Sequence, residues 1–334
     1  MKLGRVFTSG RLLALGLVLL AAAVALAVVP SNEYIFLPDK AHPVAPLVTV
    51  PNAHPPARGA VYFVDVQIQK ATMLERLFGG WPHKGADLYP ASAINAPGVS
   101  SKLQRTIDLE DMHLSQQIAA AVALKKLHKD VRVTATGALI EDVGAGLPAF
   151  GKLAPDDVIT QIDGNRVTGP ADVFRLMAKH KPGDTVAFTV RRANKTLVAH
   201  VKTTNERGRA IVGVVVGPAV DIHLPEPVRI DAGNVGGPSA GLAFALEVME
   251  QSGDDVVHGH KVAATGTIAV DGTVGAIGGI KQKTYGARAA GVDTFLVPVD
   301  NAAEARKYAH GLRIIAVKNF PQALRALATL PPAG

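Results

Sequence analysis

The chain has 334 residues, which is long enough for about two domains. Its hydrophobic content of 48% is too high for a disordered protein. It contains no Cys, which excludes thiol catalysis, cysteine-ligated metal centres and disulfide bonds. Its 35 Lys and Arg against 28 Asp and Glu give a formal charge of +7, but the basic residues are dispersed and only one Trp and five Tyr are present, so no nucleic-acid partner is expected.

An apolar segment lies near the N-terminus. Residues 12–29 form an uninterrupted apolar run of 18 residues, and the tail before it carries three basic residues and no acidic one. A helix of this length is about 27 Å long, enough for the hydrocarbon core of a bilayer. A cleaved signal peptide is the alternative, because residues 21–23 and 25–27 resemble cleavage sites, but the run is long and no polar region precedes those alanines. We therefore predict a cytoplasmic basic tail (1–11), an uncleaved transmembrane anchor in the cell membrane (12–29), and a remainder outside the cytoplasm.

The next region predicts a linker and then the first regular elements. Seven prolines between residues 30 and 58 indicate an extended linker with short strands at 34–37 and 47–50. Residues 59–130 then contain an alternating strand pattern at 60–68, an irregular stretch at 71–100, and a helical apolar spacing at 111–129.

Residues 131–203 predict a compact β-rich unit with one short helix at 170–180. The stretch 147–159, followed by Asp163 and Gly164, resembles the bacterial PDZ pattern S-P-A-x-x-G-x-L-x-x-G-D-x-I and then D-G, with Leu147 and Asp156 in place of a small residue and a glycine. The resemblance implies a domain that binds peptide ends by adding them as a strand. A β-rich spacer without a binding role is the alternative. The loop that holds the peptide carboxylate is expected at Thr136, Gly137, Ala138 and Leu139.

Residues 211–330 predict alternating strands and helices, with a helix at 239–250. Ser239 lies in the segment Gly-Gly-Pro-Ser-Ala-Gly (236–241), at the start of that helix. Free backbone N–H groups at a helix start can stabilise an oxyanion, which suits a nucleophile. An N-cap serine suits the same position, so the position alone leaves both roles open.

A nucleophilic serine needs a base. Residues 237–241 also satisfy G-x-S-x-G, but the residues before them are a poor strand, and Asp293 and His310, the candidate acid and base of such a site, have no informative context. The His258–Gly259–His260 segment lacks the spacing of a zinc helix, so no metal is expected.

A lysine can serve as the base if burial lowers its pKa from about 10.4 toward neutrality. Lys281 and Lys283 open another helical pattern directly after two glycines, in an apolar setting. The periodicity of this segment does not choose between the two lysines.

Four segments in order resemble the proteolytic domain of Lon proteases: GPSAG (237–241), ATGTI (264–268), GAIGGIKQK (275–283) and GVDTFLVP (291–298). The resemblance implies a Ser–Lys dyad with Ser239 as the nucleophile and Lys281, the first lysine of its pair, as the base. It also implies that Thr265 helps to place the lysine. The residues around the serine are Gly237, Pro238 and Ala240; the family's acid before G-P-S is Gly236 here, and its T-G-E glutamate is Thr267.

The order of apolar helix, PDZ-like unit and Lon-like domain resembles membrane-anchored PDZ-domain Lon-like proteases. No G-x-x-x-x-G-K-[ST] motif occurs, so no ATPase module is expected. We expect an α/β (α+β) Lon-type proteolytic domain (211–330), to which residues 59–130 also belong, with a β-rich PDZ-like domain (131–203) inserted and one N-terminal transmembrane helix.

The expected function is that of an ATP-independent, membrane-anchored serine endopeptidase without a cofactor. Its expected partners are unfolded or loop-exposed polypeptide substrates recruited by the PDZ-like domain and the lipid bilayer around the anchor, and a homo-oligomer is left open. Two alternatives are an inactive PDZ scaffold at the membrane and a G-x-S-x-G esterase.

Overall fold

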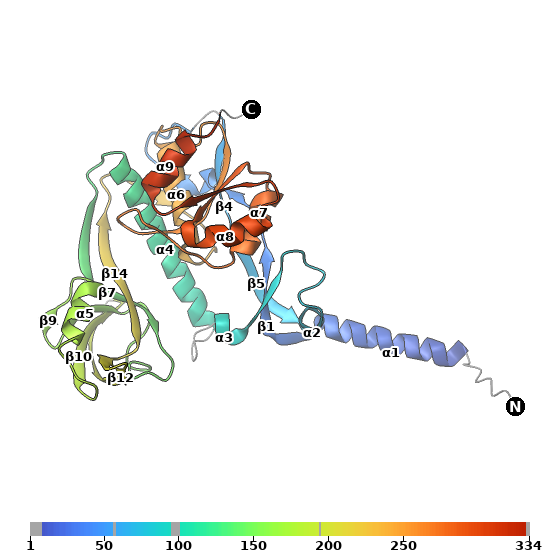
Figure 1. Cartoon of the computed structure of the whole chain (residues 1–334), viewed down its shortest axis with the longest axis horizontal. Helices are drawn as coiled ribbons and strands as arrows, with labels where there is room; N and C mark the ends of the chain where they lie inside the picture. Colours follow the sequence, from blue (N-terminus) through green and yellow to red (C-terminus); the bar gives the residue numbers. More distant parts are fainter. Residues whose placement is uncertain (1–8, 56–57, 95–100, 194, 332–334) are drawn as a thin grey trace.

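The computed structural model describes residues 9–55, 58–94, 101–193 and 195–331. Figure 1 shows a central body, a β-rich unit beside it, and one helix that extends away from the body. The long helix α4 (Ser101–Lys126) and strand β14 (Val214–His223) lie where the central body meets the β-rich unit.

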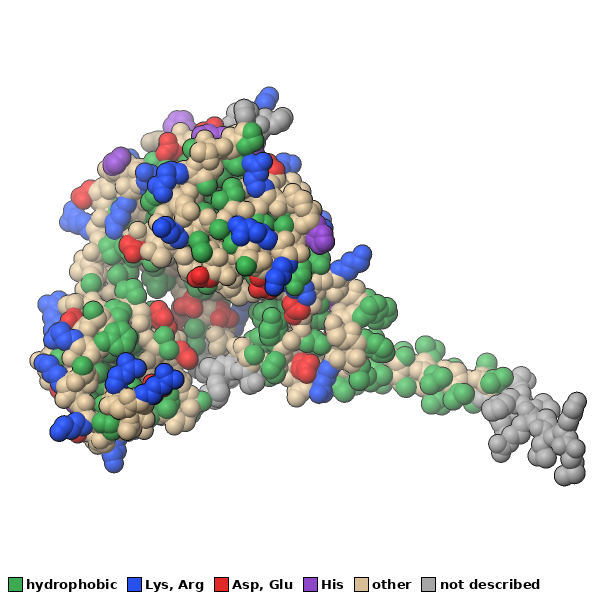
Figure 2. Space-filling view, in the orientation of Figure 1, with side chains coloured by type: hydrophobic (Ala, Val, Ile, Leu, Met, Phe, Trp, Pro, Cys, Tyr) green, Lys and Arg blue, Asp and Glu red, His purple; other side chains and the backbone are tan. Residues whose placement is uncertain are grey.

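The extending helix is α1 (Ser9–Val28), and Figure 2 shows hydrophobic side chains along it. These side chains are exposed, Leu13 to 70% of its area and Val28 to 72%. Within the described part of the chain, no helix combines the length and the hydropathy that a membrane crossing requires. The predicted transmembrane anchor is therefore not confirmed, and residues 1–8 of the predicted basic tail lie outside the described residues.

The central body contains a five-stranded sheet with the order β2–β4–β16–β19–β20. Its last four strands are parallel, and β2 pairs antiparallel with β4 at the edge. Because helices cover both faces of a parallel sheet, its central strands are apolar on both sides, and every residue of β19 is buried. The strands are β2 (His42–Pro43), β4 (Ala60–Phe63), β16 (Lys261–Ala264), β19 (Thr294–Pro298) and β20 (Arg313–Val317).

Two hydrophobic clusters lie on opposite faces of this sheet. On one face, Val262 and Leu296 pack with α4, α6 (Gly241–Gln251) and α9 (Phe320–Ala328). On the other face, Ala263 and Phe295 pack with α7 (Ile280–Ala289) and α8 (Val299–Tyr308). All residues of α6 are buried, since the sheet covers one side of this helix and α4 another.

A smaller sheet of order β5–β1–β6 adjoins the central body. Much of the predicted linker is therefore regular structure. Strand β1 (Pro30–Pro38) pairs with β5 (Val66–Thr72) on one side and with β6 (Asp87–Pro90) on the other. The region predicted as irregular contains β6 and two short helices, and a capping box stabilises the start of the first. The remaining elements here are α2 (Met73–Leu77), α3 (Ala91–Ile94), η1 (Ala45–Leu47) and β3 (Val48–Thr49), which pairs with β15 (Arg229–Ile230).

The β-rich unit is a separate sheet of order β11–β10–β8–β7–β14, with β9 paired to β8. Its own core includes Ile140, Ile159, Phe188 and Leu176, the last from helix α5 (Pro170–Met177). Strand β14 pairs along most of β7, so the segment expected to begin the Lon-like domain at residue 211 belongs to this sheet instead. The other elements are β7 (Arg132–Val143), β8 (Val158–Ile162), β9 (Asn165–Arg166), β10 (Thr185–Arg192), β11 (Lys195–Lys202), β12 (Thr204–Glu206) and β13 (Arg209–Ile211).

Candidate active site

Ser239 lies in the short 3-10 helix η2 (Pro238–Ala240), immediately before α6. The turn into η2 uses Gly237 at φ 82°, a backbone conformation that favours glycine. The turn is held by helix α4, because the Gly237 N–H donates to the Asp108 carbonyl at 2.7 Å and the Ser115 hydroxyl donates to the Pro238 carbonyl at 3.0 Å. The residue at the N-cap of α6 is Ala240, so the structure does not use Ser239 as the cap of that helix.

The side chain that meets the Ser239 hydroxyl is Lys283, which projects from α7. Its Nζ donates to Ser239 Oγ at 2.6 Å and to Thr265 Oγ1 at 3.3 Å. The Thr265 hydroxyl in turn donates to the Ser239 carbonyl at 3.1 Å, and the Gly266 N–H donates to the same carbonyl at 2.8 Å. Ser239, Thr265 and Lys283 therefore form one hydrogen-bond network. In this network, Thr265 holds the Lys283 amine in position beside Ser239.

The surroundings of Lys283 favour its neutral form. Burial lowers the pKa of Lys283 to about 8, and the negative charge of Asp65 opposes part of that shift. An ammonium group loses its hydration when it is buried, which is the reason that the charged form is disfavoured. With a pKa near 8, a large fraction of Lys283 is an amine that can accept a proton at mildly alkaline pH.

The other lysine of the pair lies on a different side of α7. Lys281 Nζ donates to Asp87 Oδ1 at 2.7 Å and to the Ala86 carbonyl at 3.2 Å. Burial of Lys281 favours the neutral amine, but the hydrogen bond and the charge of Asp87 outweigh it and raise the pKa. Residues i and i+2 of an α-helix point about 200° apart around its axis, so Lys281 and Lys283 cannot face the same site. The prediction of Lys281 as the base is corrected on this geometry in favour of Lys283.

The serine and the lysine open onto a cavity of about 480 Å³. Three further charged side chains line this cavity. Asp65 follows β4 in the chain, and Arg105 and Asp108 belong to α4. Asp108 fills the space beside Gly236, since an added Cβ at that glycine would lie 2.8 Å from the Asp108 Cβ. The apolar part of the lining is formed by Tyr34, Phe36, Phe63, Val64, Val66, Ile68, Ile94, Met112, Val235 and Ala240.

The residues of the alternative esterase site lie elsewhere. Asp293 and His310 line a different hollow, together with Tyr285 and Arg288. Asp293 accepts from the Lys261 N–H at 3.1 Å and lies 3.3 Å from the ring of His260. The structure therefore places neither the candidate acid nor the candidate histidine at Ser239.

The sequence did not reveal the groups that support the serine turn from a distant part of the chain, the Asp108 backbone carbonyl and the Ser115 hydroxyl. Asp108 and Ser115 hold the serine turn from α4, and Asp87 holds Lys281 away from Ser239. These residues lie more than 100 positions from their partners, as the Ser115–Pro238 separation of 123 shows, so no local motif contains them. The periodicity of α7 does not separate the two lysines, because buried residues lie on both sides of the helix, Ile280 and Ala287 on one and Gln282 on the other.

The residues expected to bind a peptide carboxylate do not form a loop. Thr136, Gly137, Ala138 and Leu139 lie within β7, which has β14 on one side and β8 on the other. Gly137, Ala138 and Leu139 pair with β14, and Ala138 and Leu139 also pair with β8, while Thr136 lies at a register shift. Ala138 is fully buried. The prediction of a carboxylate-binding loop at these four residues is corrected, because they lie within a strand.

Comparison with known proteins assigns two domains. Residues 186–329 match the family model described as the Lon protease (S16) C-terminal proteolytic domain, and residues 107–203 match the one described as the PDZ domain. Lon protease 2 of Bacillus subtilis is 34% identical over 112 residues, which cover 34% of this chain and 20% of that protein. Lon protease of Clostridium acetobutylicum is 38% identical over 94 residues, covering 28% of this chain and 11% of that protein. The matched part is thus a small share of these relatives.

Among solved structures, the chain is similar to the PDZ domain of the SdrC-like protein from Listeria monocytogenes. The two are 29% identical, the match covers 25% of this chain and 92% of that domain, and the TM-score is 0.24.

Proposed function

Because the chain contains a Lon-type C-terminal proteolytic domain and a PDZ domain, we propose that it is a serine endopeptidase with Ser239 as the nucleophile and Lys283 as the base. The observation that carries this proposal is the 2.6 Å contact between Lys283 Nζ and Ser239 Oγ at a buried lysine. A hydroxyl becomes an effective nucleophile when an adjacent base removes its proton, and a neutral amine has the required lone pair.

The proposed reaction has two steps. Neutral Lys283 accepts the Ser239 proton while Oγ bonds to the carbonyl carbon of the scissile peptide, and peptide N–H groups at the start of α6 stabilise the oxyanion. Protonated Lys283 then donates to the departing amine as the C–N bond breaks, which leaves an ester on Ser239. A water molecule attacks this ester while Lys283 accepts one of its protons, and Lys283 returns that proton to Ser239 Oγ as the ester C–O bond breaks, which releases the acid product and regenerates the free serine and the neutral lysine.

The substrates we propose are polypeptide segments that are already unfolded or exposed in loops. The 334 residues contain no P-loop motif for ATP, which supports cleavage without ATP-driven unfolding. The test is hydrolysis of an unfolded protein such as casein without ATP. We expect wild type and His310→Ala to cleave it and Ser239→Ala to be inactive. Equal cleavage by Ser239→Ala and wild type would contradict the proposal, and inactivity of both at every pH would favour the scaffold alternative.

We propose that the PDZ-like unit recruits these substrates by their C-terminal ends. It follows α4 and precedes β15, and α4 packs on α6 in the core beside Ser239, which supports a unit inserted into the proteolytic body. The full chain with Ser239→Ala should bind a peptide with a free C-terminus more tightly than the same peptide with an amidated end. Equal affinity for both peptides would contradict this role.

We further propose that α1 holds the protein at the outer side of a cell membrane. Its exposed leucine and valine side chains and the basic residues before it support this location. In a cell fractionation, the full chain should sediment with membranes and a chain without residues 1–29 should not. A soluble full chain would contradict the location and leave the proposed chemistry unaffected.

A further inference from the structure

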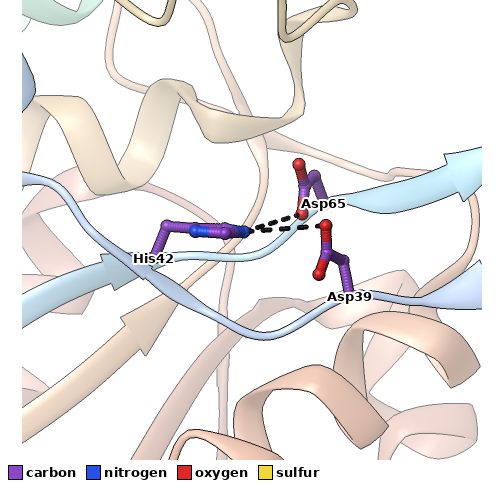
Figure 3. Close-up of side chains that lie close together, drawn as sticks. All are labelled: Asp39, His42 and Asp65. Atoms are coloured by element: carbon purple, nitrogen blue, oxygen red, sulfur yellow. Dashed lines mark ion pairs between the residues drawn. The ribbon is translucent and has the colours of Figure 1, made fainter.

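A cluster of two aspartates and one histidine lies at the edge of the central sheet, outside the serine–lysine pair. Asp39 follows β1, His42 is in β2, and Asp65 lies between β4 and β5. Figure 3 shows the imidazole of His42 directed toward the two carboxylates. One ligand atom from each residue lies within 4.8 Å of the others.

Two distances in this cluster are slightly longer than the separation between two ligand atoms of one zinc ion. His42 Nε2 is 3.7 Å from Asp39 Oδ2 and 3.7 Å from Asp65 Oδ1. Both separations exceed a normal hydrogen bond. Ligand bonds of about 2.0 to 2.2 Å in a tetrahedral Zn²⁺ site place two ligand atoms about 3.3 to 3.6 Å apart. The gap between these atoms therefore has room for an ion with only a small movement of the side chains.

An unsatisfied atom gives independent support. Asp65 Oδ1 is buried and has no hydrogen-bond partner among the described residues. A buried carboxylate oxygen without a partner is costly, and an ion is one of its common explanations. The carboxylate of Asp39 adds repulsion between like charges at the same place. A divalent cation would remove both costs.

The neighbouring residues hold the three side chains in place. The Gln67 amide donates to Asp39 Oδ2 at 2.9 Å, and the Lys40 N–H donates to Asp39 Oδ1 at 2.8 Å. The ring of His42 packs 5.4 Å from the ring of Phe63, its partner across the β2–β4 pair. Supporting contacts of this kind orient ligands before a metal binds.

We propose that Asp39, His42 and Asp65 bind one Zn²⁺ ion, with water in the remaining coordination position. One imidazole and two carboxylates are a donor set that zinc accepts, and His42 is 45% exposed on its side chain, so an ion can reach the site from solvent. Because Asp65 also lines the cavity of Ser239 and Lys283, the ion would lie at the wall of that cavity. This departs from the absence of a metal expected from the sequence.

The chain offers a matched control. His180 also faces two aspartates, but its Nε2 lies 3.0 Å from Asp163 Oδ2, a direct ion-pair distance that leaves no room for an ion between them, and its Nδ1 lies 3.8 Å from Asp184. His180→Ala therefore removes a histidine and an acidic contact without touching the proposed site.

The test is calorimetric titration of the full chain with ZnCl₂, with Co²⁺ absorption as a second measurement. We expect one Zn²⁺ per chain in wild type and His180→Ala, and an affinity lower by at least about tenfold in His42→Ala and Asp65→Asn. Co²⁺ should give a visible d–d band in wild type that His42→Ala lacks. The proposal is wrong if wild type binds no Zn²⁺, or if His42→Ala and His180→Ala bind it equally. Neither readout depends on proteolysis, so the result is separate from the proposed enzyme activity.

Discussion

The two sides of helix α7 carry the same type of residue in opposite environments. On one side, Lys283 is 4% exposed and touches the hydroxyls of Ser239 and Thr265. On the other side, Lys281 is 19% exposed on its side chain, pairs with Asp87 at 2.7 Å and lies 5.7 Å from the ring centre of Tyr308. The pKa of the first lysine is lowered and that of the second is raised.

A lysine becomes a base through the groups that surround its amine. A carboxylate within hydrogen-bond distance stabilises the ammonium form, which has no lone pair to accept a proton. Burial beside hydroxyl partners instead lowers the pKa of Lys283 to about 8, so that much more of this lysine is a neutral amine near that pH. One helix thus presents an ion-pairing lysine and a proton-accepting lysine two positions apart.

The largest effect is expected from removal of the buried lysine. Lys283→Met should lower kcat/KM for peptide cleavage by about a thousandfold or more, because Ser239 loses its base. Thermal unfolding followed by circular dichroism checks that the variant is folded. A folded Lys283→Met enzyme within tenfold of wild type would contradict the assignment of the base.

The pH dependence of wild-type activity should give the next largest effect. Lys283 accepts a proton only when it is neutral, and burial lowers its pKa from 10.5 to about 8. The value of kcat/KM should therefore rise with pH up to about 8 and level off above it, with about a tenfold loss for each pH unit below the pKa. A profile that continues to rise to pH 10 would show an ordinary, solvated lysine in this role.

A smaller effect is expected at the threonine that places the lysine. Thr265→Val keeps the shape of the side chain but removes the hydroxyl that contacts Lys283 Nζ at 3.3 Å and Ser239 O at 3.1 Å. We expect about a tenfold loss of kcat with little change in KM, or about 1.4 kcal/mol, which fits the loss of one or two hydrogen bonds between neutral groups. Thr265→Ser should restore most of the activity and the wild-type pH profile. A loss that Thr265→Ser does not repair would indicate a packing role.

The smallest effect is expected on the exposed side of α7. Lys281→Met should keep kcat/KM within about threefold of wild type and leave its pH profile unchanged, since Lys281 does not reach Ser239. The pair with Asp87 is partly exposed, so its loss should cost about 0 to 1 kcal/mol of unfolding free energy in a denaturant titration. A shift of the pH profile in Lys281→Met would mean that the two sides of the helix are coupled.

The sequence identified the parts of the site that are local in the chain. Ser239 and its glycine-containing turn form one contiguous motif, and Thr265 lies in a second one, so both could be found without a structure. The choice of lysine depended on the direction of side chains around α7 and on Asp87, about 190 residues earlier, which no local pattern reveals.

Contacts between residues far apart in the sequence also explain where the predicted fold differs from the structure. The proline-containing segment after α1 was expected to be a linker, but β1 pairs with strands from residues 66–72 and 87–90, and β3 pairs with β15 far along the chain. The apolar pattern at the start of the predicted Lon-like segment does not say which sheet β14 joins, and the structure pairs this strand with β7. Helix α4 was expected where it forms, but it begins at Ser101, before the apolar spacing that predicted it.

The most direct test is the rate at which a fluorophosphonate probe labels Ser239 in the full chain, with mass spectrometry to locate the label. This measurement reports the nucleophilicity of the hydroxyl and does not require a natural substrate. We predict labelling of Ser239 in wild type and Lys281→Met, faster as the pH rises toward about 8, and none above background in Lys283→Met. Labelling that persists in Lys283→Met and disappears in Lys281→Met would contradict the assignment of Lys283 as the base.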